Sequence, residues 1–255
     1  MSTPDPGPRD SVREEGPDTR SIFARAMGAD FDRLHPMLRR RFGVSLAAGY
    51  ACVGRGVMAS IRRGPWWTVP FLHIGRIRNI LAPYPGENVP FTVENYAYRD
   101  PFGRETVTFV RTFDYPHHPE RPGRFDATMI LGATGRIVDY LGTHQHLAVD
   151  LDLAVEEDGS LHLRSDAQRF SAGPLAFPFP MLFSGRADLR ESFDDEAGEY
   201  VIRLEVRNRT FGFLFGYEGR FTCEFPTRSR TRARPPRRAR RTPRAAAARA
   251  EAAGD

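Results

Sequence analysis

The 255-residue chain contains no lysine and only two cysteines. Its 37 permanently basic residues are therefore all arginines, a bias that, together with frequent alanine, glycine and proline, is typical of genome composition rather than of a function. Cys52 and Cys223 are too few and too isolated for a cysteine zinc site, and they argue against a disulfide framework. Both occupy strand-like contexts, so we predict buried free thiols in a reducing compartment.

Long apolar runs are also missing. No segment reaches the length of a membrane span, and the N-terminus lacks the apolar stretch of a signal peptide. We therefore expect a cytoplasmic protein without a transmembrane segment.

Sequence motifs for common chemistries are absent as well: the chain has no P-loop and no nucleophile elbow. Gly132 and Gly135 follow an apolar strand, but Val138 stands where a dinucleotide-binding loop needs its third glycine, and the residues after it alternate as a strand. No cofactor is predicted. The missing motifs weaken the case for an enzyme and leave it open.

Charge and composition divide the chain into three parts. Residues 1–20 and 226–255 have no periodic apolar face, so we expect both ends to be disordered around a single domain at 21–225. The C-terminal part has ten arginines against Glu251 and Asp255, whereas residues 21–225 have 24 arginines against 25 acidic residues. The tail at 228–249 therefore predicts weak, salt-sensitive contact with nucleic acid or an anionic membrane. The domain itself lacks the basic excess of a nucleic-acid-binding module.

The segment from Glu199 to Phe225 is the most informative part of the sequence. Read with a period of two, one face of its second half carries an aromatic row, namely Phe211, Phe213, Phe215, Tyr217, Phe221 and Phe225. Only an extended chain separates apolar and polar residues in this way, and Asn208-Arg209 lies where a tight reversal would join two strands. We expect a long, bent strand in a sheet that curls around an apolar interior.

Similar alternation runs through most of the domain, with expected strands near 50–57, 91–98, 105–113, 125–131, 137–141, 145–155, 161–163 onward and 186–193. These add up to eight to ten antiparallel strands. The predicted fold class is therefore mainly β, a β-rich α+β domain whose long antiparallel strands curl into a barrel or half-barrel.

Several helical segments accompany the strands. Ser21 can cap a helix that stops at Gly28, Asp30 can begin a second helical piece, and Pro36 can begin a further turn that ends at Gly43. The arginines at 39–41 are expected to be solvated at the end of that helix. Residues 69–81 predict a helix that covers one end of the sheet, or else a lid or membrane-surface element anchored by Trp66 and Trp67.

The candidate ligand-binding residues combine the aromatic row with two arginines. Arg111 falls among apolar strand residues, and Arg203 opposes an apolar row. An arginine facing an apolar interior needs a carboxylate or an anionic ligand, so these two indicate either the acidic head of an amphiphile or an internal ion pair. Asp126, with Arg124 on its own face, could supply such a pair.

His144 and His146 are the best candidates for metal or acid–base chemistry. Two residues apart on a strand, they project from the same face. His162 is expected opposite Ala154, too distant to share an ion with His146, so a third ligand would have to come from another strand, such as one carrying Asp126 or Asp139. The alternative is a polar outer face with solvated histidines, which we favour.

Long stretches of the domain also resemble one known family. The sequences SIFARAMGADFDRLHPMLRRRFG, PFTVENYAYRDPFGRETVTFVRTF, RFDATMILGATGRIVDYLGTHQHLAVDLDL and FPMLFSG, spread over about residues 21–225, are similar to the bacterial domain-of-unknown-function 4166 family. The resemblance implies an uncharacterised bacterial protein and transfers no catalytic residues.

Three functions remain open from the sequence. The leading hypothesis is a non-catalytic module that binds an apolar or amphiphilic, lipid-like small molecule along Phe211, Phe213, Phe215, Tyr217 and Phe221. The alternatives are a metal-dependent or acid–base enzyme centred on His144 and His146, and a domain that binds other proteins.

Overall fold

The computed structural model describes residues 18–66, 84–116, 123–142, 147–170, 185–209 and 212–227; for residues 147 and 166–170 it describes the backbone alone. The described chain forms a closed barrel of ten antiparallel strands, which confirms the predicted fold class. The strands are β1 (Cys52–Arg63), β2 (Gly86–Arg99), β3 (Glu105–Phe113), β4 (Gly123–Leu131), β5 (Ile137–Leu141), β6 (Leu147–Val155), β7 (Leu161–Phe170), β8 (Arg186–Asp194), β9 (Glu199–Asn208) and β10 (Gly212–Glu224).

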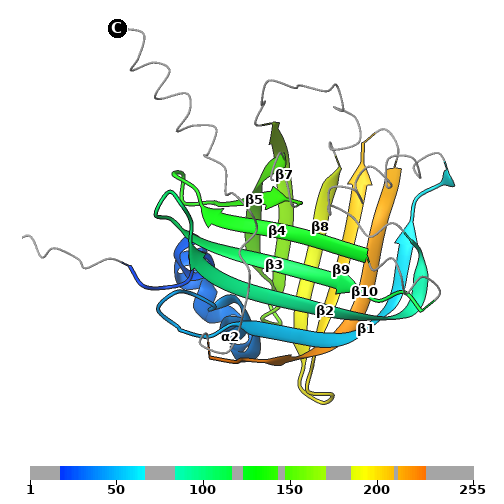
Figure 1. Cartoon of the computed structure of the whole chain (residues 1–255), viewed down its shortest axis with the longest axis horizontal. Coiled ribbons are helices and arrows are strands. Elements are labelled where there is room, and N and C mark those ends of the chain that lie inside the picture. Colours follow the sequence, from blue (N-terminus) through cyan, green and yellow to red (C-terminus); the bar gives the residue numbers. More distant parts are fainter. Residues whose placement is uncertain are drawn as a thin grey trace, which may run out of the picture.

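Each strand pairs with the next one along the chain, and β1 closes the barrel by pairing with β10 as well as with β2. In Figure 1, β2, β3 and β4 cross the front of the molecule while β8, β9 and β10 run behind them at a steep angle. Alternate side chains point inward, and the core contains buried side chains from every strand of the barrel.

Close approach of β1 and β10 at the closing seam depends on glycine. Gly56 lies opposite Phe221 in the ladder. A Cβ atom at Gly56 would come within 2.0 Å of the backbone oxygen of Arg220 and 2.5 Å of the Cα of Phe221. The seam therefore requires a residue without a side chain at this position.

Short helices cover one end of the barrel, as predicted: α1 (Ile22–Met27), the 3₁₀-helix η1 (Gly28–Arg33) and α2 (Pro36–Phe42). The Ser21 hydroxyl accepts a hydrogen bond from the amide of Ala24 at 3.1 Å, and Pro36 opens α2. Phe23 packs edge-to-face against Phe42 and against Phe109 of β3, with ring centroids 5.0 and 5.9 Å apart. These rings seal the helix end of the barrel.

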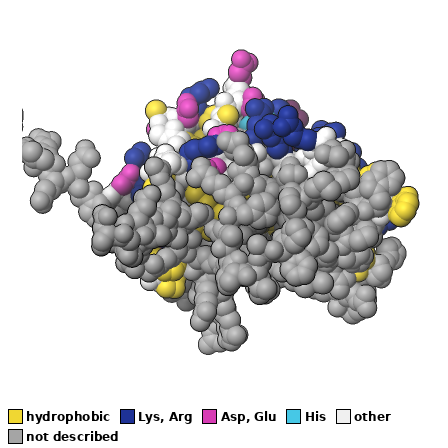
Figure 2. Space-filling model, turned by 90° about the horizontal axis from the view of Figure 1, so that it is seen from above, with side chains coloured by type: hydrophobic (Ala, Val, Ile, Leu, Met, Phe, Trp, Pro, Cys, Tyr) yellow, Lys and Arg dark blue, Asp and Glu magenta, His cyan; other side chains and the backbone are white. Residues whose placement is uncertain are grey.

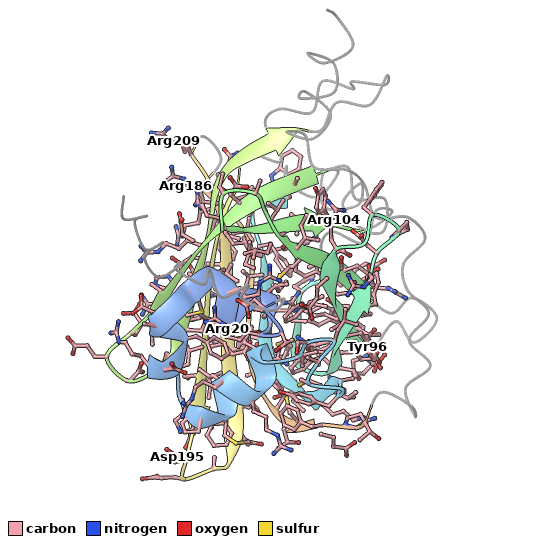
Figure 3. All side chains as sticks on the ribbon, turned by 90° about the vertical axis from the view of Figure 1, so that its left-hand side faces the viewer. Arg20, Tyr96, Arg104, Arg186, Asp195 and Arg209 are labelled. Carbon is pink, nitrogen blue, oxygen red and sulfur yellow. The ribbon has the colours of Figure 1, made fainter. Side chains whose placement is uncertain are left out.

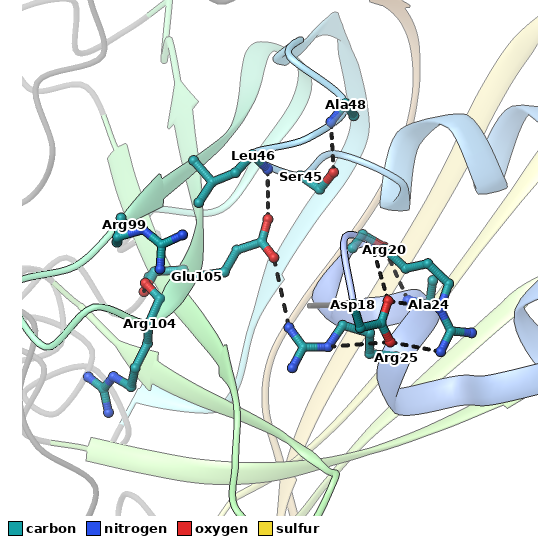
Figure 4. Close-up of polar contacts among 12 residues, drawn as sticks. Asp18, Arg20, Ala24, Arg25, Ser45, Leu46, Ala48, Arg99, Arg104 and Glu105 are labelled. Carbon is teal, nitrogen blue, oxygen red and sulfur yellow. Dashed lines mark hydrogen bonds and ion pairs between the residues drawn. The ribbon is translucent and has the colours of Figure 1, made fainter. Parts of the chain in front are cut away.

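A polar anchor ties the same segment to β3 (Figure 4). The Glu105 carboxylate accepts a hydrogen bond from the amide of Leu46 at 2.6 Å, and its other oxygen lies 3.9 Å from a guanidinium nitrogen of Arg25. Glu105 therefore holds both α1 and the chain after α2 to the first residue of β3.

The opposite end of the barrel, which we call the far rim, is formed by the last residues of the odd-numbered strands and the first residues of the even-numbered ones. Five connections join the strands at the far rim. Most of their residues lie outside the described part of the chain, as does the predicted helix at 69–81. The four connections at the helix end, residues 100–104, 132–136, 156–160 and 195–198, are all described. Among the described residues, no helix combines the length and apolarity needed to cross a membrane.

Candidate functional site

The barrel interior receives most of the predicted aromatic row. Phe215, Tyr217 and Phe221 of β10 are each about 1% exposed and belong to the core. Tyr217 contacts Phe113 of β3, with ring centroids 5.8 Å apart, and Phe221 stacks on Tyr200 of β9 at 5.1 Å. Phe211 lies outside the described residues.

Phe213 does not share this face, so its predicted place in the row is wrong. The pairing of β10 with β9 shifts by one residue between Phe213 and Phe215, a β-bulge that reverses the inside-outside order. The Phe213 ring lies on the outer face over Gly216, where an added Cβ would be 3.1 Å from its edge. Arg62 and Arg207 flank the ring at 5.4 and 5.9 Å.

Of the two predicted arginines, Arg111 points inward and Arg203 does not. Arg111 is 5% exposed, and its guanidinium lies over the rings of Phe109 and Phe125 at 5.6 and 5.0 Å. The Arg203 side chain is 58% exposed and pairs with Glu205 at 3.1 Å. The expectation that Arg203 faces an apolar interior is therefore wrong, because its strand presents that position to solvent.

Asp139 of β5 is the carboxyl group that acts electrostatically with Arg111. Burial raises the pKa of Asp139 to about 7, although the positive charge of Arg111 lowers it. Burial also raises the pKa of the Tyr217 hydroxyl, as does the negative charge of Glu191, whereas the positive charges of Arg111 and Arg41 lower it.

Four buried polar atoms in this region have no hydrogen-bond partner among the described residues: Nε of Arg111, Oδ1 of Asp139, Nδ2 of Asn95 and the hydroxyl of Tyr217. Each of these side chains is at most 5% exposed, and they come from four strands, β3, β5, β2 and β10. Buried polar groups in folded proteins are nearly always paired, so a cluster of unpaired ones is the feature of this interior that most needs an explanation.

Besides Arg111 and Asp139, the interior contains a second polar group. It lies beneath α2 and centres on Arg41, which is 1% exposed. Arg41 Nε pairs with Oε1 of Glu191, Nη2 lies 3.5 Å from Oε2 of the same residue, and Nη1 donates to the Asn95 side-chain oxygen at 3.1 Å. Burial lowers the pKa of Arg41, but the Glu191 charge, the two thiols and the hydrogen bond to Glu191 together more than offset it, and the net shift is upward. The expectation of a solvated arginine is therefore wrong at this position.

Both thiols belong to this group, and both are free, as the sequence predicts. Arg41 Nη1 lies 3.4 Å from the sulfur of Cys52 and 3.9 Å from that of Cys223. The hydrogen bond between the two thiols, together with Arg41, lowers the pKa of Cys52 to about 7, and the same thiol–thiol bond raises that of Cys223.

Comparison with known proteins shows the family of this chain. The model of the family described as "Domain of unknown function (DUF4166)" matches residues 34–221. The chain belongs to the DUF4166 family. It is also similar to the "Uncharacterized protein YndH" of Bacillus subtilis (strain 168), with 27% identity over 205 residues that cover 80% of this chain and 97% of YndH.

The match to this DUF4166 domain includes Arg111, Asp139 and Tyr217, and it includes the Arg41 group except for Cys223, which lies two residues beyond the match. Local sequence patterns also place members of these groups inside the barrel. Arg41 follows Leu38 by three residues and so falls on the buried face of its helix. Asn95 and Glu191 each alternate with apolar residues, which places them inside the barrel.

The remaining candidates of this DUF4166 domain lie elsewhere. His144 and His146 are outside the described residues. Asp126 is buried on the outer side of β4, where its carboxylate accepts from Nε of Arg124 at 2.8 Å. His162 lies opposite Ala154, as predicted, and contacts Glu156 and Asp188 at 2.8 and 2.9 Å. Within the described residues, no three metal-ligating side chains converge on one point.

Proposed function

We propose that this protein binds an amphiphilic small molecule inside the barrel, with the acidic head of the molecule at Arg111. The observation that supports this is the set of four buried polar atoms that lie among aromatic rings and have no partner in the described part of the chain. Leaving a buried polar group without a partner costs about 1–3 kcal/mol. A ligand whose head group carries hydrogen-bond acceptors would remove this cost at Arg111, Asn95 and Tyr217, which can all donate.

Charge favours an anionic head. Glu191 already pairs with Arg41, whereas Arg111 forms no ion pair among the described residues. Asp139 neutralises Arg111 only partly near neutral pH, because burial raises its pKa to about 7. The Arg111 guanidinium therefore retains a positive charge in an apolar setting, which a carboxylate or similar anion would complement.

The rings beside Arg111 suit the apolar part of such a ligand. Phe113, Phe215 and Tyr217 form a continuous aromatic contact on the far-rim side of the interior, with neighbouring ring centroids 5.8 Å apart. Phe91 extends this contact toward Phe221. The proposed head therefore lies next to apolar surface rather than at the end of a polar channel.

The test is a titration with a fluorescent long-chain fatty acid and with its methyl ester. The wild-type protein should bind the acid more tightly than the ester, and Arg111→Met should lose that preference, with acid affinity lowered about tenfold or more. Arg203→Met is the matched control, because it removes an arginine from the outer face. Arg111→Lys keeps the charge and serves as a second variant should Arg111→Met not fold.

Absence of saturable binding of either probe would contradict the proposal. So would an equal loss of affinity in Arg111→Met and Arg203→Met, because the effect would then follow net charge and not the interior site.

Asp139 supports a second candidate function, an acid–base enzyme. A carboxyl group with a pKa near neutrality beside a buried arginine is suited to proton transfer. This candidate predicts that a bound substrate is recovered chemically changed, and that Asp139→Asn abolishes the change while binding is retained. Recovery of the unchanged ligand would leave the binding function alone.

A further inference from the structure

Arginines gather on the outer face of the barrel at the far rim. Arg186 of β8 lies directly opposite Arg207 of β9 in the ladder. Arg209 follows the end of β9, and Arg62 stands near the end of β1. Figure 3 shows Arg186 and Arg209 close together, at the end of the hairpin opposite Asp195. We call Arg62, Arg186, Arg207 and Arg209 the rim arginines; all four are exposed.

Acidic partners are few in this region. Glu205 is shared by three arginines, with contacts of 3.4 Å to Arg62, 3.1 Å to Arg203 and 3.2 Å to Arg207. In the described part of the chain, neither Arg186 nor Arg209 forms an ion pair. Like charges directly opposite one another destabilise a sheet, so the pairing of Arg186 with Arg207 lowers the stability of the protein on its own.

Aromatic side chains accompany these arginines. Phe213 lies on the outer face between Arg62 and Arg207. Trp66, three residues after the end of β1, is 77% exposed. Figure 2 looks down on the molecule from the top of Figure 1, where β8, β9 and β10 reach the far rim, and shows dark-blue arginine side chains gathered on one part of that face. Exposed aromatics beside arginines are typical of surfaces that bind lipid head groups.

Among the described residues, the rim arginines lie on β1, β8 and β9 or directly after β9. On the adjoining strands, exposed Glu87 near the start of β2, which pairs with β1, and exposed Asp114 just after β3 carry negative charge. An anionic surface would therefore attract the rim through β8, β9 and β1 and repel it through β2 and β3. The distribution specifies an orientation as well as an affinity.

We propose that the far rim docks on an anionic membrane surface through the rim arginines, with Trp66 and Phe213 at the level of the lipid head groups. Negative surface potential attracts basic residues within about a Debye length, and an interfacial aromatic ring adds apolar contact. Docking in this orientation turns the helix end of the barrel away from the lipid. The proposal goes beyond binding inside the barrel, because vesicle binding needs no interior ligand.

The test uses the full-length chain and co-sedimentation with phosphatidylcholine vesicles that contain either no phosphatidylglycerol or about a third of it. The rim variant replaces all four rim arginines by glutamine. The control variant replaces Arg20, Arg33, Arg55 and Arg99, which are exposed arginines away from the far rim. Both variants keep the arginine-rich residues 228–249 and lose the same formal charge, so any difference between them reports the rim.

Wild type should bind the anionic vesicles and not the neutral ones. Each lost contact should lower the affinity about fivefold, so the rim variant, which loses four, should bind about six-hundredfold more weakly, and the control variant only a few-fold more weakly. Glu205→Gln should bind more tightly, about fivefold, because it releases three arginines. Glu224→Gln, whose carboxylate pairs with Arg55, is the matched control and should have little effect.

Tryptophan fluorescence provides an independent readout, because the two tryptophans of the chain are the adjacent residues 66 and 67. Emission should shift to shorter wavelength with anionic vesicles and be quenched by brominated lipid, and the rim variant should show neither effect. The rim variant should still bind the free fluorescent fatty acid, so the docking proposal and the interior site can fail separately.

Three results would overturn the docking proposal. The first is a wild type that does not bind anionic vesicles. The second is an equal loss of affinity in the two four-residue variants, which would assign binding to net charge. Retention of mixed-sequence single-stranded DNA through the rim arginines, without vesicle binding, would assign this face to nucleic acid.

Discussion

Arg41 shows how a single side chain links the helices to the interior of the barrel. It comes from α2, yet its guanidinium reaches Glu191 of β8, Asn95 of β2 and both thiols. The Cζ atom of the Arg41 guanidinium lies 4.9 Å from the centroid of the Phe221 ring, so a cation–π contact accompanies the ion pair. Such a buried pair costs more to break than it contributes when intact, because one lost partner leaves the other charged and desolvated.

Arg41→Met should therefore lower the free energy of unfolding by about 3–5 kcal/mol. Urea denaturation measures this directly. Arg55→Met is the control. Arg55 pairs with Glu224, but the two side chains are 61% and 76% exposed, so this ion pair should contribute at most about 1 kcal/mol to stability. The double variant Arg41→Met, Glu191→Leu should recover part of the loss, and a double variant less stable than Arg41→Met alone would contradict this description of the pair.

Asp139 predicts a pH dependence of stability. Its pKa is raised by burial from 3.8 to about 7, so as the pH rises the unfolded chain releases this proton before the folded chain does. The unfolded state therefore binds fewer protons than the folded state between about pH 4 and 7, and stability falls as the pH rises through that window. At pH values above both the unfolded and the folded pKa, the contribution of Asp139 to stability no longer changes with pH.

Asp139→Asn removes this titration. Relative to wild type, the variant should gain about 2–3 kcal/mol between pH 5 and pH 8, as measured by urea denaturation at both values. Exposed Asp30→Asn is the control and should change stability equally at the two pH values. A constant difference between wild type and Asp139→Asn would show that Asp139 does not titrate in this window.

Among the elements, the β1–β10 pair determines whether the barrel closes. Gly56 has the backbone of Arg220 and Phe221 directly beneath it, and neither can move aside as a flexible side chain would. We expect Gly56→Ala to destabilise the protein by about 2–3 kcal/mol through overpacking. Thermal or urea denaturation would measure the change.

Gly135→Ala is the matched control for the seam. Gly135 has a φ of +77° and no atom within 4 Å of an added Cβ, so only the cost of a left-handed backbone applies, about 1 kcal/mol. Equal losses in Gly56→Ala and Gly135→Ala would show that close approach of β1 and β10 is not the limiting contact.

Local signals predict most of these elements and miss one irregularity. Ser21, Gly28 and Pro36 mark the helices correctly because caps and helix starts depend on neighbouring residues alone. His35, whose Nδ1 accepts from the Met37 amide at 3.3 Å, is the cap of α2 that sequence reading missed. The bulge that turns Phe213 outward depends on the register of β9 and β10, and no period in the sequence reveals an inserted residue.

At the scale of the molecule, alternation predicts an antiparallel sheet that curls around aromatic rings. The sequence left open whether the sheet closes, since closure depends on the contact between β1 and β10, 150 or more residues apart. The interior ion pair was missed for the same reason. Within its own segment, each of Arg41, Asn95 and Glu191 is a single polar residue in an apolar pattern. Only the closed barrel brings them together.

The arrangement of the whole barrel gives the two ends different roles. Aromatic rings and Glu105 seal the helix end. Arg111, Tyr217 and Phe113 lie toward the far rim, where the arginines of β8, β9 and β1 also gather. A ligand held by Arg111 and a membrane held by the rim would thus meet at the same end of the molecule.

Native mass spectrometry of the protein purified from its own host, compared for Arg111→Met and Arg203→Met, tests the interior site most directly. The account predicts that wild type and Arg203→Met carry an additional stoichiometric mass that belongs to an acidic amphiphile, and that Arg111→Met has lost it. An unliganded wild type that also fails to take up added fatty acids would contradict the account, as would a co-purified molecule that Arg111→Met retains in full.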